Sequence, residues 1–237
     1  MTTPSFILSI ETATPVCSVS ISKDGAPFVC IESPEPNMHA SGLTVLIQKA
    51  IEQAGITFSD LSAVSVSMGP GSYTGLRIGV SAAKGLCYAL DIPLIGINSL
   101  EAMTAGFQAK STLDTSLVLL CPMIDARRQE VYTAFFDLEK NQQENTQALI
   151  VDEQSFDSYL EKNYEVYLFG SGADKFELLF EDKPNIHIVP KFETSAIYQD
   201  KLAYDKFQKQ EFEDVAYFEP FYLKDFVATK SKKNLLS

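Results

Sequence analysis

Two short polar turns carry the side chains in this sequence that are best suited to hold a phosphate. The first, residues 11–15, offers two threonine hydroxyls, and the second, residues 125–129, offers two adjacent arginines. Neither turn contains a glycine, whose missing side chain would let backbone amides approach phosphate oxygens. Pro15 also removes one amide donor from the first turn. We therefore interpret both turns as structural connections between strands and expect no nucleotide cofactor.

A third loop, Gly69-Pro70-Gly71-Ser72, follows a predicted strand and precedes a predicted helix. It lacks the length and the lysine of a phosphate-binding loop of the G-x-x-x-x-G-K-[ST] type. Ser72 has the residue type and position of a helix N-cap, which satisfies an early backbone N–H. The sequence also contains no G-x-S-x-G nucleophile elbow, so a serine hydrolase is not indicated.

Metal-binding residues are scarce. The two histidines, His39 and His187, are far apart in sequence, and Leu43 occupies the position one helical turn after His39. The four cysteines form no C-x-x-C pair and have the pattern of buried thiols. Asp125, at a predicted strand end, is an isolated carboxylate that defines no reaction alone. We predict neither a metal site nor catalytic residues.

Charge and hydropathy narrow the function further. The 237 residues carry a formal net charge of −12, which disfavours independent binding to a nucleic-acid backbone. The lysines at 230, 232 and 233 are interpreted as a solvated terminus. No segment reaches the roughly 18 apolar residues of a membrane helix, and the N-terminus lacks the pattern of a signal peptide. We expect a cytoplasmic protein without membrane contact.

The order of predicted elements repeats along the chain. Each half begins with three meandering strands and continues with alternating helices and strands. This order is typical of an α/β fold with two lobes, built from duplicated ribonuclease-H-like domains as in the actin and sugar-kinase superfamily. The polar stretch 106–115 is the expected boundary. We assign residues 1–108 to the first lobe and residues 109–237 to the second.

Two predicted helices of the first lobe are candidates for a partner surface. Residues 39–54 have apolar positions at steps of three and four, which indicates an amphipathic helix. In the next helix Gly75, Gly79 and Ala83 recur every four residues, although a helical glycine costs about 1 kcal/mol relative to alanine. Close packing explains such a stripe, either on the lobe's own sheet or on a partner. The candidate partner-binding residues are Leu43, Leu46, Ile47, Tyr73, Leu76, Arg77 and Val80.

Several motifs together resemble the TsaB (YeaZ) family of threonylcarbamoyladenosine biosynthesis proteins. They are Ile10-Glu11-Thr12-Ala13-Thr14, Gly69-Pro70-Gly71-Ser72-Tyr73-Thr74-Gly75-Leu76-Arg77-Ile78-Gly79, Ile124-Asp125-Ala126-Arg127 with Glu130-Val131-Tyr132, and Glu219-Pro220-Phe221-Tyr222-Leu223-Lys224. The second motif is highly specific, and all of them occur in the family's order over nearly the whole chain. Residues 142–214 match the family only in outline.

The resemblance implies an actin-like (ASKHA) fold and a role in placing a threonylcarbamoyl group on the adenosine next to the tRNA anticodon. In that system TsaD performs the transfer, TsaB pairs with TsaD, and the ATPase TsaE joins the complex. The resemblance also implies a homodimer through the first-lobe helices when TsaD is absent, and contact with tRNA only through the complex.

The resemblance implies a departure from TsaD at one place. TsaD-like proteins carry a metal-binding histidine pair, spaced four apart, at positions that here are Ser99 and Met103. A hydroxyl and a thioether cannot replace two imidazoles at such a metal. We therefore expect a non-catalytic subunit that binds TsaD. The alternatives are an ATP-dependent transferase of the same superfamily that acts alone and, less favoured, a metallopeptidase.

Overall fold

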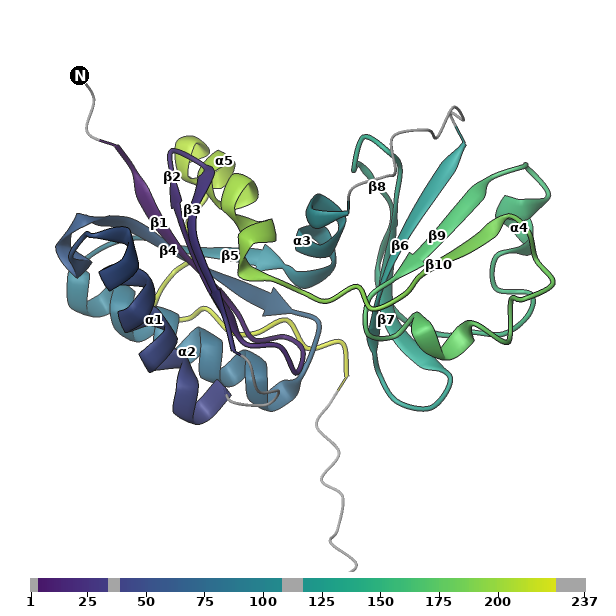
Figure 1. The fold of residues 1–237 in the computed structure, drawn as a ribbon, viewed down its shortest axis with the longest axis horizontal. Helices are drawn as coiled ribbons and strands as arrows, with labels where there is room; N and C mark the ends of the chain where they lie inside the picture. The colour runs from purple at the N-terminus through teal and green to yellow at the C-terminus, as the bar shows by residue number, and fades with distance from the viewer. Residues whose placement is uncertain (1–3, 34–38, 108–116, 225–237) are drawn as a thin grey trace, which may run out of the picture.

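The computed structural model describes residues 4–33, 39–107 and 117–224, which form two lobes, each built on a five-stranded sheet (Figure 1). The first sheet has the strand order β3-β2-β1-β4-β5. Its strands are β1 (Phe6–Glu11), β2 (Ser18–Lys23), β3 (Ala26–Glu32), β4 (Leu61–Gly69) and β5 (Leu94–Asn98). The first three strands are antiparallel, whereas β4 and β5 run parallel to β1.

The second sheet repeats this arrangement. Its order, β10-β9-β6-β7-β8, places the fourth and fifth strands beside the first in the same way. The strands are β6 (Val118–Asp125), β7 (Glu130–Phe136), β8 (Gln142–Ile150), β9 (Glu165–Phe169) and β10 (Ile186–Val189). Again the first three are antiparallel and the last two parallel to the first. The predicted two-lobed α/β fold with a duplicated unit is confirmed.

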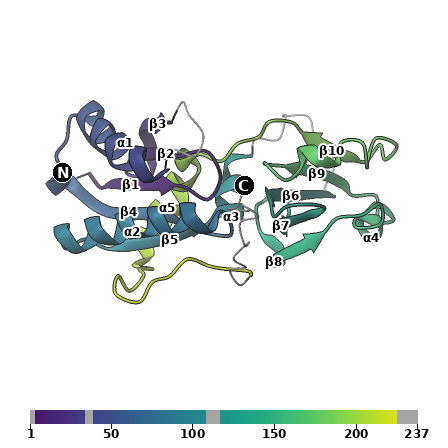
Figure 2. The ribbon, with the colours of Figure 1, turned by 90° about the horizontal axis from the view of Figure 1, so that it is seen from below.

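Two long helices cover one face of the first sheet. They are α1 (His39–Ala54) and α2 (Tyr73–Leu90), which lie side by side in both views (Figures 1 and 2). Alternate residues of the strands point at these helices because successive side chains of a strand face opposite sides. The strand residues buried in this core are aliphatic: Leu8, Ile10, Val19, Ile21, Leu61, Val64, Val66 and Leu94. Full burial of each contributes about 2 kcal/mol.

The opposite face of the first sheet is covered by a segment from much later in the chain. The 3-10 helix η3 (Ala196–Gln199) and helix α5 (Asp200–Lys209) pack there after the chain has completed the second sheet (Figure 1). This interface is partly polar, because Ser9 and Ser20 lie within hydrogen-bond distance of the buried Asp200 carboxylate, at 3.0 and 2.7 Å. The Ser65 hydroxyl donates to Gln199 at 2.9 Å.

Helix α3 (Ser99–Gly106) joins the two lobes. Leu100, Met103 and the adjacent Phe107 pack into the face of the second sheet, together with second-sheet residues such as Ile124 and Phe169. The rest of the second lobe is covered by short elements: α4 (Asp157–Leu160) and η2 (Asp174–Phe176). A further 3-10 turn, η1 (Phe58–Asp60), precedes β4.

The residues after α5 run back over the first lobe. Glu213 forms an isolated bridge with Leu94 at the edge of β5, and Phe218 is buried in the core beneath α2. The proposed boundary at residue 108/109 lies outside the described residues. A division by chain order assigns residues 200–224 to the second lobe, whereas their contacts lie mainly with the first. We propose that the lobes are better defined by these contacts.

No helix in the described part of the chain is long and apolar enough to cross a membrane.

Candidate functional site

A cavity of about 730 Å³ opens between the two lobes. Its walls come from the two polar turns at residues 11–15 and 125–129, from the start of α2 and from the C-terminal segment. The lining residues are Ala13, Thr14, Pro15, Pro70, Gly71, Ser72, Tyr73, Thr74, Ile124, Asp125, Ala126, Arg127, Tyr132, Ser171, Phe221, Tyr222, Leu223 and Lys224. The structure therefore brings together the two turns singled out in the sequence, although they lie more than a hundred residues apart.

The first turn is held by contacts within the chain. The buried Glu11 carboxylate accepts a hydrogen bond from the Ala13 amide at 2.6 Å, and burial raises the pKa of this carboxyl group. The Thr14 hydroxyl lies 2.7 Å from that of Thr194. The Thr12 hydroxyl is buried under α2 and has no hydrogen-bond partner among the described residues. These contacts agree with a structural role for the turn.

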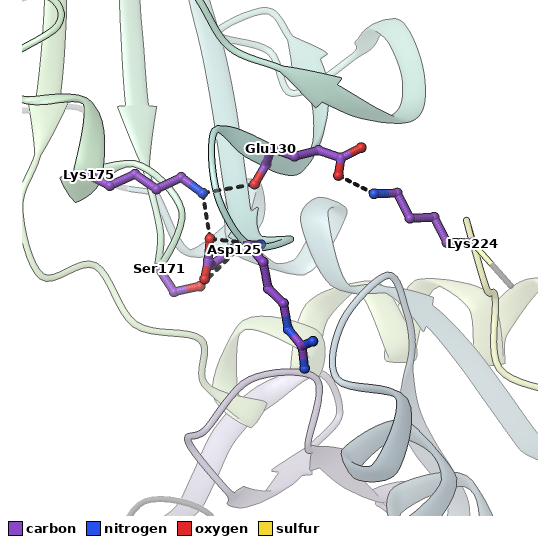
Figure 3. A network of polar contacts seen from close by, with 6 residues as sticks. Asp125, Glu130, Ser171, Lys175 and Lys224 are labelled. Carbon is purple, nitrogen blue, oxygen red and sulfur yellow. Dashed lines mark hydrogen bonds and ion pairs between the residues drawn. The ribbon is translucent and has the colours of Figure 1, made fainter. Parts of the chain in front are cut away.

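The second turn has an unusual backbone. Arg127 and Arg128 both adopt positive φ angles, of 75° and 55°, which cost non-glycine residues about 1–2 kcal/mol each. Asp125 at its start forms an ion pair with Lys175 at 2.5 Å, and Lys175 also donates to the Glu130 carbonyl at 2.8 Å (Figure 3). The Asp125 carboxylate is thus neutralised by a neighbouring cation, although half of its surface is exposed.

The glycines at the start of α2 are explained by the first turn. A Cβ on Gly75 would lie 2.1 Å from the Thr12 carbonyl oxygen, and one on Gly79 would lie 2.3 Å from the Thr12 hydroxyl. Ser72 caps the helix as predicted, because its side chain accepts from the Gly75 amide. The stripe of small residues therefore faces the lobe's own sheet and the turn that leads out of it.

Most of the predicted partner-binding side chains also point into the first lobe. Five of the seven are 0–7% exposed and belong to the interior of the first lobe: Leu43, Leu46, Ile47, Leu76 and Val80. The expectation that they lie on an exposed face is wrong, because they form the inner sides of α1 and α2. Tyr73 is half-buried and Arg77 is exposed. The Arg77 Nε donates to the Tyr222 hydroxyl at 3.1 Å, and the Tyr73 and Tyr222 rings are 5.0 Å apart.

The outward side of α2 carries other residues. Thr74, Ser81, Gly85, Tyr88 and Ala89 are exposed, and the Tyr88 side chain is 86% exposed. A Cβ added to Gly85 would meet no atom within 4 Å, in contrast to Gly75 and Gly79. Nothing within the described chain therefore explains a glycine at this helical position. The sequence periodicity identified the helix and its glycines but could not tell which side faced the sheet.

Comparisons with known proteins agree with this architecture. A family model described as TsaD, tRNA N6-adenosine threonylcarbamoyltransferase, matches residues 36–236. The chain belongs to this family. The tRNA threonylcarbamoyladenosine biosynthesis protein TsaB of Escherichia coli K12 is 35% identical over 135 residues, which are 57% of this chain and 56% of that protein. TsaB of Bacillus subtilis is 31% identical over 130 residues, which are 55% and 54%.

The chain thus spans about half the length of the curated TsaB relatives it matches. Among solved structures, YeaZ from Pseudomonas aeruginosa superposes with a TM-score of 0.72 at 20% identity, over 92% of this chain and 100% of that one. This likeness confirms the predicted two-lobed, actin-like fold class. Together with the named relatives it confirms the resemblance to TsaB (YeaZ) within the TsaD family.

Ser99 and Met103, the positions matched to the TsaD histidine pair, are both buried at the junction of the lobes. The Met103 side chain packs against Gly170, and the Ser99 hydroxyl has no hydrogen-bond partner among the described residues. In the whole described part of the chain, no group of three or more histidine, cysteine or acidic side chains is placed to hold a metal. His187 instead pairs with Glu165 at 2.6 Å, while the His39 side chain lies outside the described part.

Proposed function

We propose that this chain is a TsaB-type subunit that binds TsaD and supports threonylcarbamoylation of the adenosine next to the tRNA anticodon in the cytoplasm. TsaE joins the complex, and tRNA is contacted only through it. The membership of the TsaD family and the TsaB relatives support this role. The observation that carries the binding role is the exposed side of α2, where a Cβ added at Gly85 would meet no atom of the described residues within 4 Å.

The chain is proposed to be a non-catalytic partner. Two polar groups that line the interlobe cavity are engaged by side chains next to it: Asp125 by Lys175, and Thr14 by Thr194. The second turn holds two arginines where a phosphate-binding turn favours glycine. Ser99 and Met103 are both buried, and a hydroxyl and a thioether are poor substitutes for two imidazoles at a metal. Each feature argues against the alternative of a transferase that acts alone.

The proposed partner surface is the outward side of α1 and α2. Glycine costs about 1 kcal/mol in a helix, so a central glycine without an internal contact is favoured where another backbone approaches closely. Ser81 and Ala89, one turn to either side of Gly85, continue a low surface for such an approach. Tyr88 stands beside it as an exposed aromatic side chain, the residue type enriched at binding hot spots. Tyr73 and Arg77, the two predicted residues that are not buried, are proposed to form the rim of this partner surface.

The decisive experiment is co-purification with TsaD from the same organism, followed by a tRNA modification assay with and without this chain. Gly85→Arg places a long charged side chain on the outward face without touching the lobe's core. We expect the variant to stay folded, to lose the TsaD complex and the homodimer, and to lower modification at least tenfold. Because one face serves both partners, homodimer and heterodimer are expected to be mutually exclusive.

Gln154→Arg, an equally exposed change on the second lobe, serves as the matched control and is expected to leave the complex intact. Unchanged affinity of Gly85→Arg for TsaD would show that the partner binds elsewhere. The isolated chain is expected to show no multiple-turnover ATPase activity or tRNA modification. Robust turnover abolished by Asp125→Ala would support the transferase instead.

A further inference from the structure

The two lobes are held together differently on the two sides of the cavity. On one side lies α3, whose apolar residues Leu100, Met103 and Phe107 are buried against the second sheet. On the other side lies the end of the C-terminal strap, which we define as residues 211–224. Figure 1 shows α3 and the yellow end of the strap at opposite sides of the region between the lobes.

The strap is anchored firmly to the first lobe. Phe218 is buried in the core under α2, and Lys84 of α2 donates to the carbonyls of Ala216 and Phe218 at 3.1 and 3.0 Å. Further along, the Phe221 amide donates to the Met68 carbonyl at 2.7 Å. The Tyr222 ring is tilted against the Tyr73 ring, and its hydroxyl accepts the hydrogen bond from Arg77. The strap therefore has a defined path along α2 up to the cavity wall.

At its end the strap crosses to the second lobe. Lys224 forms an ion pair with the carboxylate of Glu130 at the start of β7 (Figure 3). Its ammonium group also lies 5.9 Å from the centre of the Tyr132 ring. The carbonyl of the same Glu130 accepts from Lys175, the partner of Asp125 in the cavity wall. The last described residues of the strap thus connect α2 to the second turn.

We propose that the strap is a latch that holds the two lobes together across the mouth of the cavity, with α3 as the hinge. The two attachments differ in strength. The hinge is apolar and buried, whereas the side chains of Lys224 and Glu130 are 41% and 23% exposed. An ion pair with this exposure shifts an equilibrium by no more than about fivefold. The latch is therefore weak enough to open without unfolding either lobe, and it sets the width of the cavity.

The latch is tested by the distance between the lobes in the full chain. Spin labels are placed on Ser81→Cys in α2 and on Gln154→Cys after β8, in a Cys30→Ser background that removes the exposed thiol. Residue 154 lies in the second lobe three positions after Val151, whose amide donates to the Gln129 carbonyl next to Glu130. Labelled chains are diluted with unlabelled chains, so that only distances within one molecule are measured by pulsed electron resonance.

Lys224→Glu is expected to raise the population with a longer interlobe distance about two- to fivefold. The double variant Lys224→Glu/Glu130→Lys, which exchanges the two charges, is expected to restore the original distribution. A stop after Phe218, which keeps the buried anchor, should open the lobes further. Lys201→Glu is the matched control, since it breaks an exposed pair with Asp205 within α5 alone. An unchanged distribution in both Lys224→Glu and the truncated chain would overturn the latch, as would opening that the charge exchange fails to reverse. This result does not depend on TsaD binding.

Discussion

The two faces of the first sheet are built from different chemistry. The face under α1 and α2 is lined by aliphatic residues, and the helices that cover it follow the first strands directly in sequence. The face under η3 and α5 is mixed: Ile7 and Ala63 are apolar, but Ser9, Ser20 and Ser65 between them are hydrogen-bonded to Gln199 or Asp200. The covering segment arrives there only after the chain has built the second sheet.

This difference affects how specifically each covering segment docks on the sheet. Apolar burial is strong but non-directional, so it suits helices that the chain connectivity already places nearby. A segment that returns from almost two hundred residues away must find one register on a sheet. Buried polar groups stabilise only the arrangement that pairs them, because unpaired ones are costly. We infer that the serine-lined face fixes where η3 and α5 dock.

The largest expected effect comes from a charge on the apolar face. Leu76 is fully buried, so Leu76→Glu leaves an unpaired carboxylate in the core at a cost of about 3–5 kcal/mol. We expect loss of cooperative folding, measured by circular dichroism during thermal denaturation, and therefore loss of TsaD binding as a secondary effect. The neighbouring Arg77→Glu, on the exposed side, is the control and should stay folded. A folded Leu76→Glu chain with a native melting temperature would contradict the burial of this side.

The sequence predicted much of this fold because its strongest signals are local. The apolar run of β1, the alternation of apolar and small polar residues in β2 and the helical periodicity of α1 and α2 depend on a few neighbouring residues. The glycine-free turns and the Ser72 cap were likewise visible in the sequence. The sequence also predicts one final helix over about residues 194–212, whereas the chain forms η3 followed by the shorter α5.

What the sequence could not reveal depends on contacts between distant residues. The orientation of α2 follows from the approach of Gly75 and Gly79 to Thr12, which periodicity does not encode. The same is true of the serines: a strand alternating serine with aliphatic residues reads as half-exposed, yet Ser9 and Ser20 are fully buried. Asp200 was missed for this reason. A pattern of serines at every second position in several strands could have indicated a polar cover.

An intermediate effect is expected from pH on the polar face. Burial raises the pKa of Asp200 to about 7, and hydrogen bonds from Ser20 and Ser9 oppose that rise. Between about pH 4 and pH 7 the Asp200 carboxyl group is therefore protonated in the folded chain but ionised in the unfolded chain. The contribution of Asp200 to the free energy of unfolding falls as pH rises through this range and is constant above it. The full difference is on the order of 4 kcal/mol.

Asp200→Asn removes this titration while keeping a similar shape. We expect the variant to gain stability relative to the unmodified chain as pH rises from 5 to 8, measured by urea denaturation at several pH values. Glu11, also buried with a raised pKa, and Cys30 titrate near this face, so the comparison between the two chains isolates Asp200. A stability difference that does not change with pH would show that Asp200 is ionised throughout.

The smallest effect concerns the outward side of α2 and gives the most direct comparison with its inward side. Gly85→Ala should raise the free energy of unfolding of the isolated chain by about 1 kcal/mol, because alanine favours the helix and the added Cβ meets nothing within 4 Å. Gly79→Ala should instead destabilise it, since the same atom would lie 2.3 Å from the Thr12 hydroxyl. Urea denaturation of both variants measures this difference in sign. If Gly85→Ala is destabilising, Gly85 has a role within the lobe. If it is stabilising, the glycine is retained despite a cost to the isolated chain, which favours a requirement outside it.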